Sequence, residues 1–239
     1  MASGFNRNVT GHTKSAGLTY DVGLREYFLK VYNYMGLGLG FTGLISYFIA
    51  SSPMILQALY GNSAFSILLM LAPLGVVFYM QFRLQSLSLS QLQTLFWIFS
   101  GLMGLSLAPV FLVYTGTSIA RVFFITAGTF GAMSLYGYTT KKDLSAWGSF
   151  LFMGLIGLII GGLVNLFLQS SGFQFLLSAA GVIVFTGLTA YDTQMIKEIY
   201  DSSDDHETYG KKAIIGALSL YMDFINLFLS LLRLLGDRR

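Results

Sequence analysis

Two aspartates, Asp192 and Asp223, interrupt long apolar segments near the C-terminal end of the chain. Asp192 lies one helical turn before the end of its segment, about 6 Å inside at a rise of about 1.5 Å per residue. Asp223 lies further into the next segment, at a depth of about 15 Å by the same rise. A carboxylate at such a depth in a membrane costs at least a few kcal/mol unless it is paired, hydrated or protonated. Both aspartates are therefore candidates for a functional site.

Other polar residues recur at helical spacing around Asp223. Asp223, Asn226 and Ser230 fall at positions i, i+3 and i+7, so they share one face of a helix. Ser219 and Gly216 lie one and two turns earlier on the same side. A polar stripe through the middle of an apolar helix should face protein or water rather than lipid. We therefore expect this last helix at the centre of the bundle, with the other helices around it.

The helices that carry Asp192 and Asp223 are consecutive, and hence antiparallel, so small bends could bring the two carboxyl groups within hydrogen-bonding distance. Two carboxyls that close cannot both ionise cheaply, so they would share a proton and could titrate near physiological pH. The pair would hold the helices together when protonated and repel when both groups are charged. The alternative is a protonated or hydrated packing pair with no role in gating.

Few other ionisable residues suggest a site. Arg83 ends an earlier apolar segment on the same side of the membrane and could neutralise the pair, or it could be an interfacial anchor. The acidic loop 201–207 could attract divalent cations, but it lacks the EF-hand spacing and its glycine, which favours a solvated turn. Lys141, Lys142 and Trp147 form an ordinary basic and aromatic membrane anchor.

Enzyme chemistry is not indicated. The chain has no cysteine, and its two histidines, His12 and His206, lie in polar segments, so thiolate and histidine-rich metal sites inside the membrane are excluded. Tyr191-Asp192 matches half of the motif pair of intramembrane aspartyl proteases, but the residues before Asp223 do not match the second half. We expect no catalytic residues and no cofactor.

The elements that position these residues follow from composition. Of 239 residues, 54% are apolar and only 10% charged, against roughly a quarter charged in soluble domains. A membrane-spanning helix needs about 20 apolar residues, and seven segments qualify: 28–50, 64–82, 92–114, 119–138, 147–168, 173–196 and 213–235. These runs are too continuous for barrel strands and lack the charged face of a soluble bundle. The prediction is an all-α membrane protein with seven transmembrane helices.

We divide the chain into a polar N-terminal segment, 1–27, which lacks the apolar core of a signal peptide, and a transmembrane domain, 28–239. With a cytoplasmic N-terminus, ten of the 14 Lys and Arg residues fall on the cytoplasmic side. The exceptions are Arg121, Arg233, Arg238 and Arg239. The C-terminal arginines would reach the cytoplasm if a late segment only dipped into the membrane, but we expect full spanning. The net charge of +3 reflects topology rather than nucleic-acid binding.

Three sequence blocks carry a family resemblance. GLTAYDTQ at 187–194 and GALSLYMDFINLF at 216–228 are similar to two characteristic blocks of the transmembrane Bax-inhibitor-motif family, and KKDL at 141–144, before Trp147, is similar to a loop of that family. The span count and length also agree, so the resemblance covers essentially the whole chain.

This resemblance implies a seven-helix fold with the last helix enclosed by the other six, in the inner membrane of a bacterium. It also implies a pH-sensitive calcium leak in which Asp192 and Asp223 sense pH and Arg83 matches a family arginine. The two carboxylates, with Asn226, Ser230 and backbone carbonyls, would supply oxygen ligands to calcium. Some bacterial relatives are instead linked to a membrane-bound AAA protease. The second hypothesis is therefore a non-transporting regulator of that protease or of another stress-response partner, contacted through the N-terminal segment.

Overall fold

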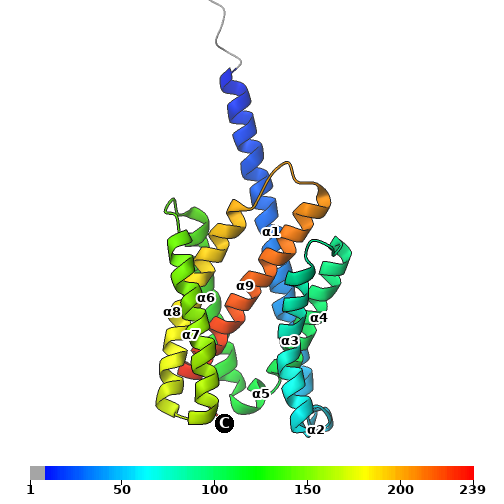
Figure 1. Ribbon diagram of the computed structural model, residues 1–239, viewed down its shortest axis with the longest axis vertical. Coiled ribbons are helices and arrows are strands. Elements are labelled where there is room, and N and C mark those ends of the chain that lie inside the picture. The colour runs from blue at the N-terminus through cyan, green and yellow to red at the C-terminus, as the bar shows by residue number, and fades with distance from the viewer. Residues whose placement is uncertain (1–8) are drawn as a thin grey trace, which may run out of the picture.

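The computed structural model describes residues 9–239, with side chains from Val22 onward. This part of the chain is all-α, as predicted, and its only extended pairing is an isolated bridge between Tyr114 and Arg238. Its helices, labelled in Figure 1, are α1 (Val9–Ala50), α2 (Pro53–Tyr60), α3 (Ser63–Arg83), α4 (Leu89–Leu107), α5 (Val110–Val113), α6 (Gly116–Thr139), α7 (Ser145–Leu168), α8 (Ser171–Glu198) and α9 (His206–Leu235).

Six segments of the described chain are long and apolar enough to cross a membrane. They comprise α3, α4 together with α5, α6, α7, α8 and α9. A seventh is obtained if α1 from Val22 onward and α2, which meet at 99°, count as one span. The prediction of a membrane protein built of helices is therefore confirmed, and the described residues contain six spans, or seven if the bent pair counts as one.

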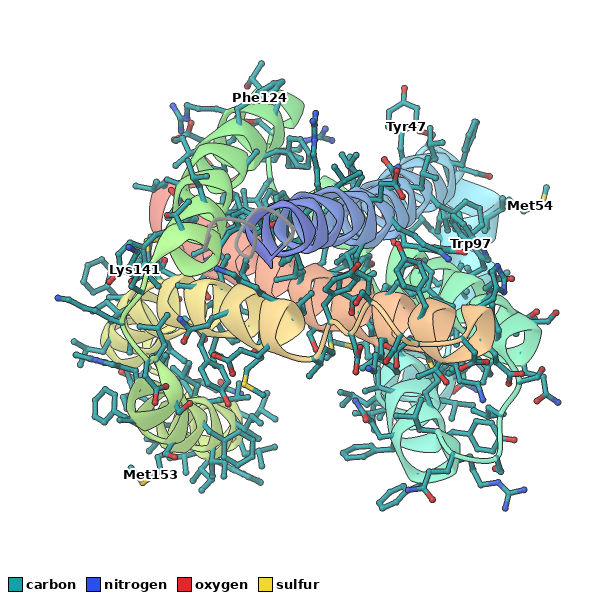
Figure 2. The ribbon with its side chains drawn as sticks, turned by 90° about the horizontal axis from the view of Figure 1, so that it is seen from above. Tyr47, Met54, Trp97, Phe124, Lys141 and Met153 are labelled. Carbon is teal, nitrogen blue, oxygen red and sulfur yellow. The ribbon has the colours of Figure 1, made fainter. Side chains whose placement is uncertain are left out.

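The outer surface of the bundle is apolar. Phe82 is 84% exposed and Phe167 is 88% exposed. Figure 2 shows the side chains of Phe124 and Met153 pointing away from the bundle, and both are exposed. Because large apolar patches are rare on soluble monomers, this surface indicates that the helices are surrounded by lipid.

Several helices begin at a polar residue whose side chain accepts hydrogen bonds from backbone amides. Asn62, Thr115, Ser170 and Asp205 do so at α3, α6, α8 and α9. Ser88 forms a reciprocal capping box with Gln91 at α4. Each such cap satisfies donors that have no partner within the helix, which fixes where these spans start.

Proline accounts for two features that the apolar pattern does not predict. The connection 51–63 contains α2, which begins with Pro53, a residue whose fixed φ suits the first turn of a helix. The predicted span 92–114 is interrupted between α4 and α5 at Pro109, because proline has no N–H to continue the hydrogen-bonding ladder.

The N-terminal division is less sharp than the sequence suggests. Residues 1–8 of the predicted polar segment lie outside the described residues. From Val9 the chain is helical and continues without a break through residue 28. Leu24 and Tyr27 are buried in the main core, so the helical bundle includes the last residues before the predicted boundary.

Helix α9 is the most buried span, and it crosses the middle of the bundle in Figures 1 and 2. It packs against α8, α1, α6 and α4, whereas α3 packs chiefly on α4 and α7 on α8. A predominantly buried helix agrees with the predicted polar stripe. Its enclosure by all six other helices stays a prediction.

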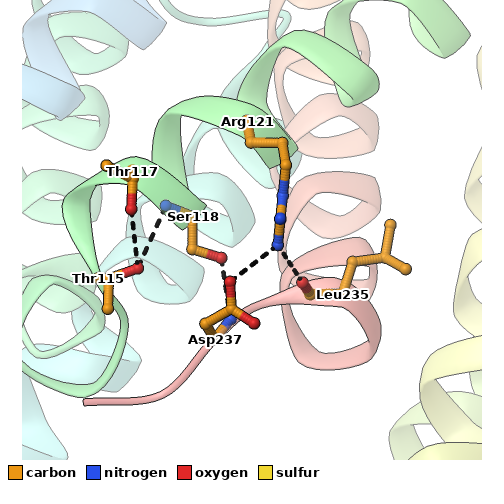
Figure 3. A network of polar contacts seen from close by, with 6 residues as sticks. All are labelled: Thr115, Thr117, Ser118, Arg121, Leu235 and Asp237. Carbon is orange, nitrogen blue, oxygen red and sulfur yellow. Dashed lines mark hydrogen bonds and ion pairs between the residues drawn. The ribbon is translucent and has the colours of Figure 1, made fainter.

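The C-terminal tail is fastened to the start of α6, as Figure 3 shows. The guanidinium of Arg121 donates to the Leu235 carbonyl at 2.9 Å and pairs with the Asp237 carboxylate at 3.0 Å. The amide of Asp237 donates to the Ser118 hydroxyl at 2.9 Å, and the amide of Thr115 donates to the Asp237 carbonyl at 3.1 Å. The tail therefore lies at the end of the bundle opposite the α8–α9 loop, as full spanning of the last segment requires.

Candidate functional site: an aspartate pair between α8 and α9

Helices α8 and α9 form a closely packed antiparallel pair. A Cβ placed on Gly216 of α9 would lie 3.1 Å from a side-chain carbon of Ile196 on α8. A Cβ placed on Gly181 of α8 would lie 2.6 Å from the Ser230 hydroxyl oxygen of α9. These two contacts lie on either side of Asp223 along α9, so the face of α9 that carries the polar stripe is directed at α8.

Asp192 and Asp223 meet between those two contacts. Their carboxyl groups lie close enough to interact directly with each other. Asp223 is only 5% exposed, and Asp192 is half-buried. The Oδ2 atom of Asp223 is buried and has no hydrogen-bond partner among the described residues.

No lysine or arginine in residues 22–239 forms an ion pair with either carboxyl group; the pairs in this range are Arg121–Asp237, Lys211–Glu207 and Lys212–Asp204. A hydrogen bond between two carboxyls needs a proton on one of them. Without a cation nearby, two adjacent buried carboxylates repel and lose their hydration. The geometry therefore suits two carboxyls that share one proton, because ionising both would leave two adjacent buried charges.

The other residues of the predicted stripe lie along α9 with Asp223. The Ser230 hydroxyl is buried and donates to the Asn226 backbone carbonyl at 2.7 Å. Asn226 and Ser219 are half-buried. The structure thus places Ser230 against α8, on the same face as the aspartate pair.

Arg83 is not brought to the pair. It is exposed at the C-terminal end of α3, a helix that packs chiefly on α4 rather than on α8 or α9. Its guanidinium forms no ion pair with a carboxylate of the described residues. A role for Arg83 as charge partner would require a movement of α3 and stays a prediction.

The acidic loop is occupied with local contacts. Asp204 pairs with Lys212 at 2.6 Å, Glu207 pairs with Lys211 at 2.7 Å, and Asp205 caps α9. Residues of the metal-binding types do not gather in groups of three or more within the described part of the chain.

Comparison with known proteins identifies the family. The family model described as "Inhibitor of apoptosis-promoting Bax1" matches residues 24–239. The chain belongs to the Bax inhibitor family. The match begins at Leu24, which is the first buried core residue among the side chains that the structure describes from Val22 onward.

Bacterial members of the Bax inhibitor family are similar over nearly their full length. The chain is 50% identical over 227 residues to an uncharacterized protein, RP147, of Rickettsia prowazekii, covering 95% of this chain and 96% of that one. It is 47% identical over 219 residues to the inner membrane protein YbhL of Escherichia coli K12, covering 91% and 94%. A membrane protein of Streptococcus pyogenes is 34% identical over 228 residues, covering 90% and 94%.

This Bax inhibitor family protein also has a hydroxyl network beside the pair that the sequence analysis missed. The Tyr32 hydroxyl hydrogen-bonds to Ser134, and the Ser134 hydroxyl hydrogen-bonds to Thr193 at 2.9 Å. Thr193 follows Asp192 directly, so the network joins α1 and α6 to the stretch of α8 that carries the aspartate. Single hydroxyl residues are common in apolar helices. Because these three lie on different helices, no spacing in the sequence indicates that they meet.

Proposed function

We propose that this protein is a pH-gated cation leak of the bacterial inner membrane, with calcium as the preferred ion and Asp192 and Asp223 as the gate. The observation that supports this is the pair of adjacent carboxyls between α8 and α9, with which no lysine or arginine of residues 22–239 forms an ion pair. A purely structural contact between α8 and α9 could be made by apolar residues at no electrostatic cost. A pair that must exchange a proton to change its contact provides a pH-dependent switch.

The pair controls the packing of the last two helices. With one proton on the pair, the hydrogen bond joins α8 to α9. With both carboxyls ionised, two charges about 4 Å apart repel by about 4 kcal/mol at an effective dielectric constant of about 20. That is a large fraction of the total stability of a folded protein. Double ionisation would therefore loosen the contact between α8 and α9 and provide two anionic ligands for a hard cation such as calcium.

A route beside α9 needs one aromatic side chain to move. A small cavity of about 110 Å³ is lined in part by Thr42, Ser46 and Phe224. Phe224 also lines a larger groove between α1 and α6, so this residue borders both spaces. The Phe224 ring packs edge-on against Phe123 and Phe130, at centroid distances of 5.5 Å each. Since Phe224 follows Asp223 directly, movement of α9 at the pair would displace this wall.

Calcium flux into liposomes, measured against pH, tests the proposal. We expect flux through the unaltered protein to rise with pH as the pair loses its proton. Asp192→Asn and Asp223→Asn should give low, pH-independent flux, because an amide cannot ionise. Asp143→Asn, which removes an exposed charge in the loop between α6 and α7 and keeps a side-chain oxygen that can accept from the Ser145 amide, is the matched control and should keep the original profile. A double asparagine variant that retains the pH-dependent flux would refute the gate.

The competing function is regulation of a membrane-bound AAA protease or another stress-response partner without transport. The feature that favours it is the first part of α1, which extends beyond the rest of the bundle in Figure 1. Deleting residues 1–21 leaves the buried Leu24 and Tyr27 in place and so should spare the fold. Unchanged flux with lost binding of the protease would support this function, whereas unchanged binding would contradict it.

The orientation on which both functions depend is also part of the proposal. The distribution of Lys and Arg favours a cytoplasmic N-terminus, which places the α8–α9 loop in the cytoplasm as well. Labelling of single cysteines introduced at Ser203 and Thr117, in a chain that has no cysteine of its own, tests it. The cysteine that replaces Ser203 should react with an impermeant thiol reagent only after the cells are opened. The cysteine that replaces Thr117 should react already in intact spheroplasts.

A further inference from the structure

A long groove runs between α1 and α6 on the outside of the bundle, with a volume of about 730 Å³. This volume lies within the range of about 300–1,000 Å³ found for ligand pockets. Its walls are mainly apolar and include Phe28, Leu29 and Met35 of α1 and Phe130 and Leu135 of α6. Leu29 is 52% exposed and Leu135 is 63% exposed, so the groove is open to the surroundings of the bundle, which are lipid.

The length of the groove matches one leaflet of a bilayer. Its lining on α1 extends from Arg25 to Met35 and on α6 from Tyr138 back to Ala127. At a rise of about 1.5 Å per residue each stretch is about 15 Å long, which is half of the roughly 30 Å hydrocarbon thickness. An acyl chain of one leaflet therefore has the length and polarity that this groove accommodates.

The end of the groove near the α8–α9 loop is positively charged. Arg25 lines the groove there and is exposed. The Lys197 ammonium donates to the Tyr138 carbonyl at 2.8 Å and lies 5.3 Å from the centroid of the Tyr138 ring, which also lines the groove. Neither cation forms an ion pair with a carboxylate of residues 22–239. The neighbouring acid on α1, Glu26, lines a different cavity together with Lys30.

We propose that this groove binds one acyl chain of an anionic phospholipid, with the lipid phosphate between Arg25 and Lys197. Basic side chains at the membrane surface attract anionic lipids, and guanidinium groups bind phosphate oxygens through paired N–H donors. The acyl chain of the lipid would pack on Phe28 and Phe130 and reach Phe224 at the bottom of the groove. This site does not depend on ion conduction.

Native mass spectrometry of the full chain in detergent, titrated with phosphatidylglycerol or phosphatidylcholine, tests the site. We expect the anionic lipid to bind about tenfold more tightly. Gly131 lines the groove, and a Cβ added there would meet nothing within 4 Å, so Gly131→Leu should fill the groove and weaken binding of phosphatidylglycerol about tenfold. Gly157→Leu, at a similarly open position on α7 away from the groove, is the matched control and should bind as the unaltered protein does.

A second variant removes the two cations and leaves the apolar walls of the groove unchanged. Arg25→Gln combined with Lys197→Gln should abolish the preference for phosphatidylglycerol over phosphatidylcholine while weak binding of both remains. Equal binding by the Gly131→Leu and Gly157→Leu proteins would overturn the location of the site. A lipid preference that survives loss of both cations, or oleate that binds as tightly as phosphatidylglycerol, would overturn the assignment to a phospholipid headgroup.

Discussion

Gly137 of α6 is the position at which one added methyl group should do most damage. A Cβ placed there would lie 2.2 Å from the Ala190 carbonyl oxygen and 2.9 Å from its carbonyl carbon on α8. Both are backbone atoms, so no side-chain rotation can relieve the collision, and α8 itself must shift. Gly128 on the same helix has nothing within 4 Å of the corresponding Cβ. A comparison of two variants, Gly137→Ala and Gly128→Ala, therefore separates the steric cost of the added methyl group from its effect on helix propensity.

The expected magnitudes follow from these two surroundings. Replacing glycine by alanine within a helix gains at most about 1 kcal/mol of intrinsic helix stability, and Gly128→Ala should show only this gain. Overpacking costs about 1–3 kcal/mol, occasionally more, and a rigid backbone contact belongs at the upper end. Gly137→Ala should thus lose about 2 kcal/mol, which leaves a difference of about 3 kcal/mol between the two variants.

Unfolding in mixed micelles of mild and denaturing detergent, followed by the fluorescence of the two tryptophans, measures this difference. Because Ala190 lies two residues before Asp192, Gly137→Ala should also shift the pH profile of calcium flux, whereas Gly128→Ala should not. Equal unfolding free energies for the two variants would refute the reasoning, since they would show that α6 and α8 do not meet at Gly137.

Three further predictions concern contacts away from the pair. The Thr42 hydroxyl lies 2.7 Å from the Tyr221 hydroxyl and donates to a backbone carbonyl at 2.8 Å; Thr42→Val should cost about 1–3 kcal/mol of unfolding free energy, and less when Tyr221→Phe is added, as a double-mutant cycle would show. Phe224→Ala should raise calcium flux at every pH, whereas Phe228→Ala should not, because Phe228 lines the smaller cavity but not the groove; equal flux in the two variants would exclude Phe224 as the residue that separates the two spaces. Arg121→Gln removes a pair whose side chains are 54% and 69% exposed and should cost less than about 1 kcal/mol in the same detergent titration, with a smaller cost at high salt.

The meeting of the two aspartates could be predicted because it depends on local features of the chain. Helices α8 and α9 are joined by a short loop, so their register is limited by sequence distance, and the depth of each carboxyl follows from the rise per residue. The spacing of Asp223 and Ser230 likewise predicts a shared face, and the contact of Ser230 with Gly181 agrees with it.

Features that depend on the angular position of distant helices could not be predicted. Apolar residues surround most of these helices, so hydrophobicity does not tell a lipid-facing side from a protein-facing one. The sequence therefore did not indicate that Tyr32, Ser134 and Thr193 from three helices would meet, nor that Arg83 would lie outside the site on α3. The apolar residues of α2 are too few to span a membrane, so the sequence predicts only a connection at 51–63.

The fastening of the C-terminal tail to α6 makes α9 a lever with a fixed end. From Leu235, next to the attachment, to Asp223 is about 18 Å along the helix, and from Leu235 to His206 is about 44 Å. If α9 swings as a rigid rod about its attached end, a displacement of Asp223 is magnified about 2.4-fold at the α8–α9 loop. A movement of about 1 Å at the carboxyl pair would then move the start of α9 by more than about 2 Å. Loss of a single proton at the carboxyl pair would in this way displace the α8–α9 loop at the end of the bundle.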